Sequence, residues 1–319
     1  MAVYKTSDAV GEKEDLSEVI ARIDPDETPV FSNAEKVTTS GVFTEFQVQE
    51  LTASDDSNYV NEGADYSYVN PTATTRLGNY HQISVQAASV SNTLDVVDKA
   101  GREREEAYVK VLKGIEQRRD IEKSLFKNEA RSGSDPRKAG KLISWITNVS
   151  ISATGTPSAA ATGDGTDTAS FTGTDRALAL SQIDAVMQAC YEDGGNPSML
   201  VVSPANKVAF SGLSSGSVAT NQITMTANAP KEAAIIGSVA LYLSDFGTLN
   251  VTIDRQLGNG TVFLLDPDFY SIGHLPGRMF SSTEVAPTGD AKKFAIVSEW
   301  TLIVKAPKAH GYVGDLTGA

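Results

Sequence analysis

Cysteine, histidine and long apolar runs are scarce in this sequence. With Cys190 as its single cysteine, the chain can form no internal disulfide and no cluster of thiolate metal ligands. No apolar run approaches the roughly 20 residues of a membrane-spanning helix. The first 20 residues also lack the apolar centre of a secretory signal. These absences predict a soluble protein that is made in the cytoplasm and has no membrane partner.

Positive charge is also in short supply. Lys and Arg number 27 against 40 Asp and Glu, which gives a formal charge of -13 and an isoelectric point near 4.7. Tight nucleic-acid binding requires neutralisation of phosphates, so we expect no tight or sequence-specific binding of DNA. The 40% hydrophobic and 21% charged content is that of a globular protein, and 319 residues suffice for one large domain or two ordinary ones.

One short motif matches an enzyme signature. Residues 212–216 read GLSSG, the G-x-S-x-G pattern of a hydrolase nucleophile elbow, with Ser214 as the nucleophile. The elbow requires a strand directly before the serine and a helix after it. Here a helical pattern precedes Ser214 and a polar loop follows. We therefore predict no enzyme, and a serine hydrolase that uses Ser214 is kept as an alternative.

Metal and phosphate sites are not predicted either. His81, His274 and His310 are far apart and lack ligand spacing, so we expect each to be hydrogen-bonded or exposed, with His310 in a polar tail. GDGTDT at residues 163–168 resembles a calcium loop but lacks the acidic ligand a dozen positions on. LGNG at 257–260 is typical of a hairpin turn between two strands. The sequence thus predicts no catalytic, cofactor-binding or metal-binding residues.

The first part of the chain contains thin elements. Residues 1–40 are polar, and Pro25 and Pro29 stop helix and favour extended chain after one short helical turn, so we expect an arm. Alternating apolar residues predict strands at 42–51 and 81–87, joined by a long polar segment. A two-stranded ribbon is marginal in water by itself. We expect this ribbon to lie on a partner.

A long polar helix follows. Helical spacing continues from Asp98 to Phe126, and a helix of that length would extend roughly 40 Å. Many of its residues are charged, and Glu106 and Lys110 form one i,i+4 pair of opposite sign. Because the apolar stripe is narrow, this helix cannot be the centre of a globular core.

The second half has the pattern of a compact α/β region. A helix is predicted from Thr174 or Asp175 to Gly194, with Cys190 on its apolar side as buried filler. Residues 199–202 form an apolar strand, and Ser203 and Pro204 are typical of the start of another helix.

The longest apolar strand predicted in the chain comes near the end. It extends from Phe294 to Pro307 and contains Trp300, which we expect in the core. A charged residue at that position, as in Trp300→Asp, is expected to abolish folding.

The order of parts and two segments resemble a known family. The order is an arm, a long ribbon, a polar helix, a compact α/β region and a returning strand. Residues 76–93, RLGNYHQISVQAASVSNT, resemble the segment between ribbon and long helix in one branch of the major capsid proteins of tailed bacteriophages. Residues 286–316 resemble the C-terminal segment of the same branch, in which a TGD turn precedes a long strand and an Ala-His pair, here Ala309 and His310. These proteins share the Hong Kong 97-type fold.

The resemblance implies an α+β Hong Kong 97-type capsid fold with central β-sheet and flanking helices in the axial domain. It also implies a division of the chain. The parts would be an N-terminal arm (1–40), an extended β-hairpin called the E-loop (41–97), a peripheral domain with a long spine helix (98–173), an axial domain (174–276), and a return strand with the tail (277–319).

The function implied is that of a major capsid protein. Copies would assemble as hexamers and pentamers into the icosahedral head that encloses the double-stranded DNA of a tailed phage, so the protein would reside in the virion. Some members carry a removable scaffold-like N-terminal region, and because this sequence has none, a separate scaffolding protein is expected. A portal and a possible cement or decoration protein would be further partners. The alternative within the fold is an encapsulin-type compartment shell.

Overall fold

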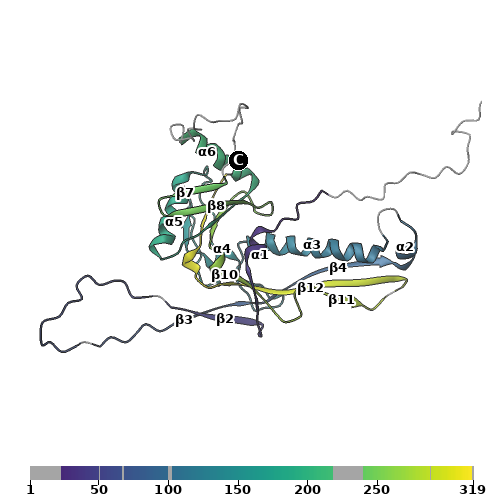
Figure 1. Ribbon diagram of the computed structural model, residues 1–319, viewed down its shortest axis with the longest axis horizontal. Coiled ribbons are helices and arrows are strands. Elements are labelled where there is room, and N and C mark those ends of the chain that lie inside the picture. The colour runs from purple at the N-terminus through teal and green to yellow at the C-terminus, as the bar shows by residue number, and fades with distance from the viewer. Residues whose placement is uncertain are drawn as a thin grey trace, which may run out of the picture.

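The computed structural model describes residues 23–49, 51–66, 68–99, 103–217, 240–287 and 289–317. Two sheets and a projecting hairpin account for most of the β structure (Figure 1). A long helix, α3 (Glu105–Leu125), lies along one sheet, whereas shorter helices accompany the other. Among the described residues, no helix is both long and apolar enough to cross a membrane.

The five-stranded sheet is organised around one long strand, β12 (Ala291–Val304). On one side β12 pairs antiparallel with β4 (Gln82–Ser91) along residues 291–300. On the other side it pairs with β11 (Ser281–Val285) and then with β10 (Tyr270–His274). A short strand near the N-terminus, β1 (Glu35–Thr38), adds in parallel to β10. The 14 residues of β12 therefore hold three other strands in place.

The six-stranded sheet has the order β5–β13–β9–β6–β8–β7. These strands are β5 (Asn148–Ser150), β13 (Gly311–Val313), β9 (Val262–Leu265), β6 (Met199–Val202), β8 (Gly247–Ile253) and β7 (Leu241–Ser244). The central strands β6 and β9 are buried along their whole length, as their apolar sequences predict.

Helices connect and cover these sheets. They are α1 (Pro29–Asn33), α2 (Asn92–Val96), α3, α4 (Leu142–Trp145), α5 (Leu180–Glu192) and α6 (Pro204–Ser217), with two 3-10 turns at Pro267–Phe269 and Pro307–Ala309. One apolar cluster joins α1, α3 and α4 to strands of both sheets, and a second cluster lies between α5 and the six-stranded sheet. The two sheets therefore share one continuous core.

The hairpin consists of β2 (Phe43–Val48) and β3 (Thr75–Tyr80), which pair antiparallel from Phe43–Tyr80 to Val48–Thr75. Residues 49–74 connect them, and the described part of this segment contains no helix or strand; we call it the hairpin loop. The ribbon prediction was wrong in its second strand, because residues 82–87 belong to β4 and pair with β12. The alternating pattern gave the strand but not its partner.

The long helix begins later than the spacing predicts. α3 starts at Glu105 instead of Asp98, because α2 brings Asp95 to its first turn. Asp95 Oδ1 accepts the backbone N–H groups of Glu105 and Glu106 at 3.1 and 3.3 Å. The predicted pair of Glu106 and Lys110 is confirmed at 2.6 Å.

Three local predictions in the remaining chain were also wrong. Pro29 begins a helix instead of ending one, since its missing N–H costs nothing at the first helical position. α5 starts at Leu180 because Arg176 is held in extended backbone contacts with Asp315 and Thr317. LGNG is no hairpin turn, since β8 and β9 lie on opposite sides of β6.

Several predictions were confirmed. β6 and β12 form at the predicted places, and Trp300 is fully buried, with its indole N–H donating to Ser84 Oγ at 3.0 Å. Ser203 caps α6 through the Asn206 N–H, and Pro204 is the first residue of that helix. Cys190 is fully buried on α5. The helical turn predicted before Pro25 lies outside the described residues.

Candidate assembly surfaces

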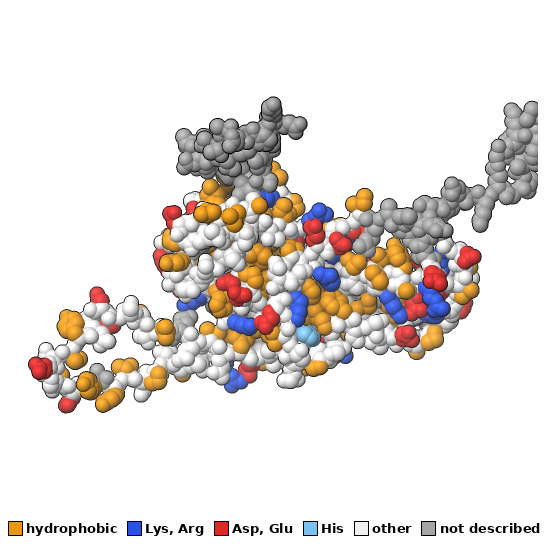
Figure 2. Space-filling model, in the orientation of Figure 1, with side chains coloured by type: hydrophobic (Ala, Val, Ile, Leu, Met, Phe, Trp, Pro, Cys, Tyr) orange, Lys and Arg blue, Asp and Glu red, His pale blue; other side chains and the backbone are white. Residues whose placement is uncertain are grey.

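The hairpin loop exposes large apolar side chains that no other part of the described chain covers. Leu51 and Tyr68 are 97% and 93% exposed. The loop projects away from both sheets (Figure 1), and its apolar side chains are spaced along it (Figure 2). The exposed members of this set are Leu51, Tyr59, Val60, Tyr66, Tyr68 and Val69. Exposed apolar groups gathered in one segment are typical of an interaction site.

The hairpin loop also carries charge of one sign. Residues 49–74 contain five acidic residues and no Lys or Arg. A surface that receives this loop would therefore be apolar with basic groups at its margin.

The root of the hairpin, in contrast, is anchored firmly. Asn79 is fully buried on β3, and its side-chain amide donates to the carbonyls of Gly140 and Leu302 at 3.0 and 2.7 Å. Its Oδ1 accepts the Gly140 N–H at 2.8 Å. Three hydrogen bonds from one amide thus fix the point at which the hairpin leaves the body.

His81 lies at the same root. It is fully buried, and its Nε2 is 3.0 Å from the hydroxyls of both Thr39 and Thr44. Burial lowers the pKa of His81, so the neutral ring is favoured there. The prediction that His81 is hydrogen-bonded is confirmed.

One face of the five-stranded sheet is a second apolar surface. In the β4–β12–β11 part, Val85, Val297 and Ser281 stand opposite one another, as do Ala87, Ala295 and Thr283. Directly opposed residues share a face, and α3 packs on the other one, where Phe294 and Ile296 are buried. Ile83 and Val85 are about half exposed on this face. We call it the open sheet face.

Basic groups flank the open sheet face. Glu299, whose side chain is 6% exposed, accepts from Arg278 Nε at 2.6 Å and from Arg137 Nη2 at 3.0 Å. Two guanidinium groups on one carboxylate leave a net positive charge. Lys293 stands on the same face, opposite Val285. This margin complements the acidic hairpin loop.

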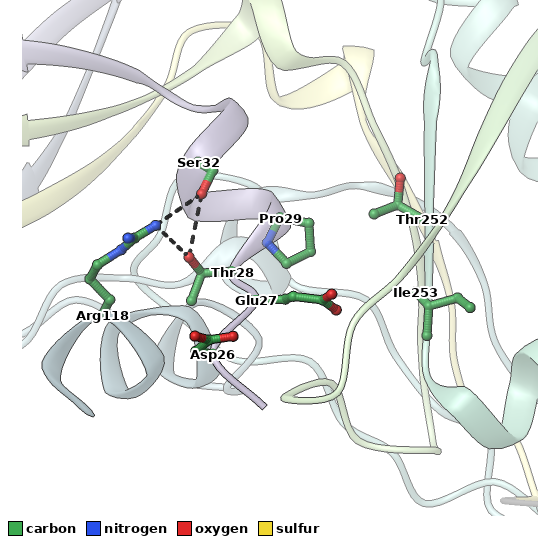
Figure 3. Close-up of a pocket in the computed structure, with 8 residues that line it drawn as sticks. All are labelled: Asp26, Glu27, Thr28, Pro29, Ser32, Arg118, Thr252 and Ile253. Atoms are coloured by element: carbon green, nitrogen blue, oxygen red, sulfur yellow. Dashed lines mark hydrogen bonds between the residues drawn. The ribbon is translucent and has the colours of Figure 1, made fainter. Parts of the chain in front are cut away.

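A groove lies where the N-terminal segment, α3 and β8 meet (Figure 3). It has a volume of about 550 Å³ and is lined by residues of α1 and the chain before it, by Arg118 of α3, and by Thr252 and Ile253 of β8. Arg118 Nη2 donates to Thr28 Oγ1 at 3.1 Å and to Ser32 Oγ at 3.3 Å. The groove therefore marks the seam where three parts of the fold meet.

A buried pair of carboxyls lies beside this groove. Glu122 of α3 is fully buried, and its two oxygens accept the N–H groups of Val30 and Phe31 at 2.7 Å each. Asp254, which directly follows β8, is also fully buried, and its carboxyl lies beside that of Glu122. Burial, the hydrogen bond to Asp254 and the Asp254 charge raise the pKa of Glu122 to about 8.

Sequence reasoning missed this pair. Glu122 does offer a signal, because it falls three and four residues before Leu125 and Phe126 on the buried side of α3. Asp254 offers none, since it is 132 residues away and only the fold brings it there.

The other residues considered from the sequence form no common site. The backbone of Gly212–Gly216 lies inside α6, so Ser214 is in the interior of a helix and not at a strand-to-helix elbow. His310 directly precedes β13 and is fully buried, and its Nδ1 accepts the Asp266 N–H at 3.1 Å. The prediction of a polar tail around His310 was wrong, and burial lowers its pKa to about 4.

No metal centre is present in the described ranges of the chain. In GDGTDT the carboxylates accept hydrogen bonds from the loop itself: Asp164 Oδ1 from the Thr166 N–H at 2.8 Å, and Asp167 Oδ1 from the Thr162 N–H at 3.0 Å. Burial raises the pKa of Cys190 to about 11, so its thiol stays protonated.

Comparisons with known proteins agree with this geometry. The family model for the SU10 major capsid protein matches residues 3–317. A comparison with curated protein sequences gives no match.

Solved structures share the fold at low identity. The capsid asymmetric unit of Cyanophage A-1(L) is 14% identical with a TM-score of 0.65, covering 98% of each chain. A Mycobacterium phage Ogopogo structure is 13% identical with a TM-score of 0.61, covering 98% of this chain and 99% of the other. The holo encapsulin complex from Synechococcus elongatus is 9% identical with a TM-score of 0.55, covering 94% of each chain.

Proposed function

Since the chain belongs to the SU10 major capsid protein family, it is a structural protein of the tailed-phage virion shell, and we propose that its copies close that shell as hexamers and pentamers. The proposal depends on the hairpin loop. Leu51 and Tyr68 of this loop are almost completely exposed, although the root of the hairpin is anchored through Asn79. Apolar surface of this kind is stabilised when another copy covers it.

We propose that the hairpin loop contacts a neighbouring copy, and the open sheet face supports a specific place for that contact. The loop is apolar and acidic, whereas the face is apolar with Arg137 and Arg278 at its margin. Complementary charge fixes register and orientation between copies. Residues 41–97 would then perform the clamping expected of an E-loop.

The remaining parts take their roles from the same proposal. Residues 1–40 act as the arm, 98–173 as the peripheral domain with the spine helix, 174–276 as the axial domain near the symmetry axes, and 277–319 as the return strand and tail. Support comes from β12, which returns along β4 and closes the five-stranded sheet over α3.

Removal of most of the hairpin loop tests the clamp. In a variant with Thr52–Pro71 replaced by a two-residue Asn-Gly turn, β2 and β3 keep their pairing residues and Asn79 keeps its contacts. We expect a folded monomer or small oligomer that forms no closed shells in negative-stain images. The wider deletion of Thr52–Gly78 would have the same effect on shells, but it also removes most of β3.

The matched control is the pair of substitutions Asn58→Ser and Asn70→Ser, which alter polar residues of the same loop and should leave shells unchanged. Normal shells from the truncated chain would contradict the clamp. Failure of the truncated chain to fold would be visible as loss of its circular dichroism. It would show that the truncation disturbs the root of the hairpin around Asn79 and not only the loop.

The partners follow from the shell. We propose a separate scaffolding protein, a portal at one vertex and a possible decoration protein, together with packaged double-stranded DNA that the acidic wall does not bind tightly. One similar structure, from Phage G, contains major capsid proteins together with decoration proteins. Tight binding of duplex DNA by purified shells at about 0.15 M salt would contradict the role of the acidic wall.

An encapsulin-type compartment is the second candidate, favoured by the shared fold with the Synechococcus elongatus complex. The two differ in cargo, since an encapsulin would enclose protein. Mass spectrometry and nuclease treatment of particles purified from infected cells distinguish them. Neither candidate assigns catalysis, and the family is a structural one.

A further inference from the structure

The carboxyl pair of Glu122 and Asp254 joins three separate parts of the molecule. Glu122 belongs to α3, Asp254 directly follows β8 of the six-stranded sheet, and the N–H groups that Glu122 accepts belong to α1. Each of the two acidic side chains is fully buried. Two buried carboxylates in contact repel each other strongly unless a proton lies between them.

The hydrogen bonds of Asp254 also call for that proton. Asp254 Oδ1 accepts the Gln256 N–H at 2.7 Å, whereas Asp254 Oδ2 is buried and receives no donor from the described residues. A protonated Glu122 supplies the missing donor and still accepts the two N–H groups of α1. With both carboxyls ionised, Oδ2 would be a buried charge without a partner.

Other charged groups around the pair do not neutralise it. Lys36 attracts Glu122, but its ammonium donates to the carbonyls of Phe31 and Ala34 at the end of α1. Glu27 adds negative charge near Asp254, and Arg118, one turn before Glu122, is bonded to Thr28 and Ser32. From β10, Tyr270 donates its hydroxyl to the Val30 carbonyl and stays neutral.

We propose that Glu122 and Asp254 share one proton, and that this proton fastens α1 and the end of β8 to α3, so that its loss releases α1 from the seam. The groove of Figure 3 lies beside the pair, since Pro29 and Ile253, which line it, directly precede Val30 and Asp254. The shared proton is a latch on the N-terminal segment. It is a property of the single chain and goes beyond the clamp and the shell.

The sign of the pH dependence follows from linkage. In the closed state, in which α1 is bound to the pair, the pKa of Glu122 is raised from 4.5 to about 8. Binding of α1 is therefore fully favoured below pH 4.5. The preference for the closed state declines as pH rises through about 8. Opening releases one proton in this window, and its equilibrium constant rises about tenfold per pH unit.

Hydrogen–deuterium exchange of the peptide that spans Thr28–Ala34 measures the opening, in the full-length unassembled chain between pH 5 and pH 8. Rates are divided by those of the same synthetic peptide at each pH, which removes the intrinsic dependence of exchange on pH. We expect the remaining protection to fall about tenfold per pH unit. A flat profile in the unmodified chain overturns the proposal.

Two neutral substitutions sharpen the test. Glu122→Gln and Asp254→Asn each remove the need for the shared proton, so protection should no longer change between pH 5 and pH 8. Either variant suffices if the other fails to fold. The matched control is Glu116→Gln on the same helix, where Glu116 is half exposed and pairs with Lys113, and the slope should persist there. A slope retained in the folded pair variants, or lost in the control, overturns the latch.

Because these measurements use single chains, they are independent of shell closure. A chain whose protection falls with pH but which forms no shells would contradict the proposed function and support the shared proton. A chain that forms shells but whose protection does not change with pH would support the proposed function and contradict the shared proton.

Discussion

The hairpin loop and the six-stranded sheet both consist of extended chain, but they differ in how their apolar side chains are covered. β6 and β9 are buried along their whole length by neighbours from the same chain, whereas the loop leaves Tyr68 and Leu51 exposed. The centre of the sheet is complete within one copy. The loop is not, so the same polypeptide contains one region stabilised by folding and another whose apolar groups, in the shell we propose, are covered by a neighbouring copy. If this comparison holds, interior changes should affect the single chain and loop changes should affect only the assembly.

The largest effect is expected from Trp300→Asp. It places a carboxylate in the core that the two sheets share and removes the bond from the indole N–H to Ser84. The expected loss is roughly 3–5 kcal/mol of unfolding free energy or more. Soluble expression and thermal denaturation measure it, and a well-folded Trp300→Asp chain would show that this strand is not the centre of the core.

The next effect tests the other side of the comparison. Tyr68→Ser combined with Val69→Ser removes two exposed apolar groups from the hairpin loop. We expect unchanged thermal stability of the single chain within about 0.5 kcal/mol, together with a clear rise in the protein concentration needed for shell assembly. Light scattering at a series of concentrations measures this. A destabilised single chain would mean that the loop folds back on its own body.

A smaller effect is the pH dependence of stability that comes from the buried His310. The pKa of His310 is lowered from 6.5 to about 4, so the stability contributed by neutral His310 is present above pH 6.5 and is lost as pH falls through about 4. About 3 kcal/mol is at stake, at about 1.4 kcal/mol per pKa unit. The Glu122–Asp254 pair changes the stability of the chain in the opposite direction over part of this pH range. The effect of His310 is therefore measured as a difference between two chains that both contain the pair.

Denaturation of the unmodified chain and of His310→Gln from pH 7 to pH 4 isolates the His310 contribution, because the carboxyl pair is common to both. The difference in stability should shrink as the pH falls. His274→Gln is the control, since His274 is only partly buried at the end of β10. A difference that does not change with pH would show that His310 can be protonated without cost.

The smallest effect is expected from Ser214→Ala. The backbone at Ser214 is helical, and no elbow geometry surrounds it. Shell assembly should be unaffected. An esterase activity that is present in the purified protein and lost in this variant would restore the hydrolase alternative.

Sequence patterns predicted the elements whose burial is decided locally. The apolar run of β6 is buried along its whole length, and so is the second half of β12 from Ser298 to Val304, so the positions of these strands followed from composition alone. The start of α6 at Pro204 was likewise predictable, because the cap that Ser203 provides involves only the Asn206 N–H, three residues away.

What could not be predicted depends on residues far apart in the chain. The partner of β2 is β3, because residues 82–87 pair instead with β12, more than 200 positions later. The start of α3 is set by Asp95, and the start of α5 by contacts of Arg176 with the tail. The carboxyl pair and the open sheet face are products of these long-range pairings. The hairpin loop, in contrast, was apparent from the sequence as a long polar segment, but its exposed apolar side chains were not predicted.

Asn79 and its neighbours set how far the fixed body of the subunit extends into the hairpin. The Asn79 amide ties β3 to the Gly140 and Leu302 backbones, and Phe46 and Leu77 of the hairpin pack against the core that the two sheets share. We expect copies that meet at different angles in a curved shell to differ in the direction of the hairpin loop and to keep the same root and core.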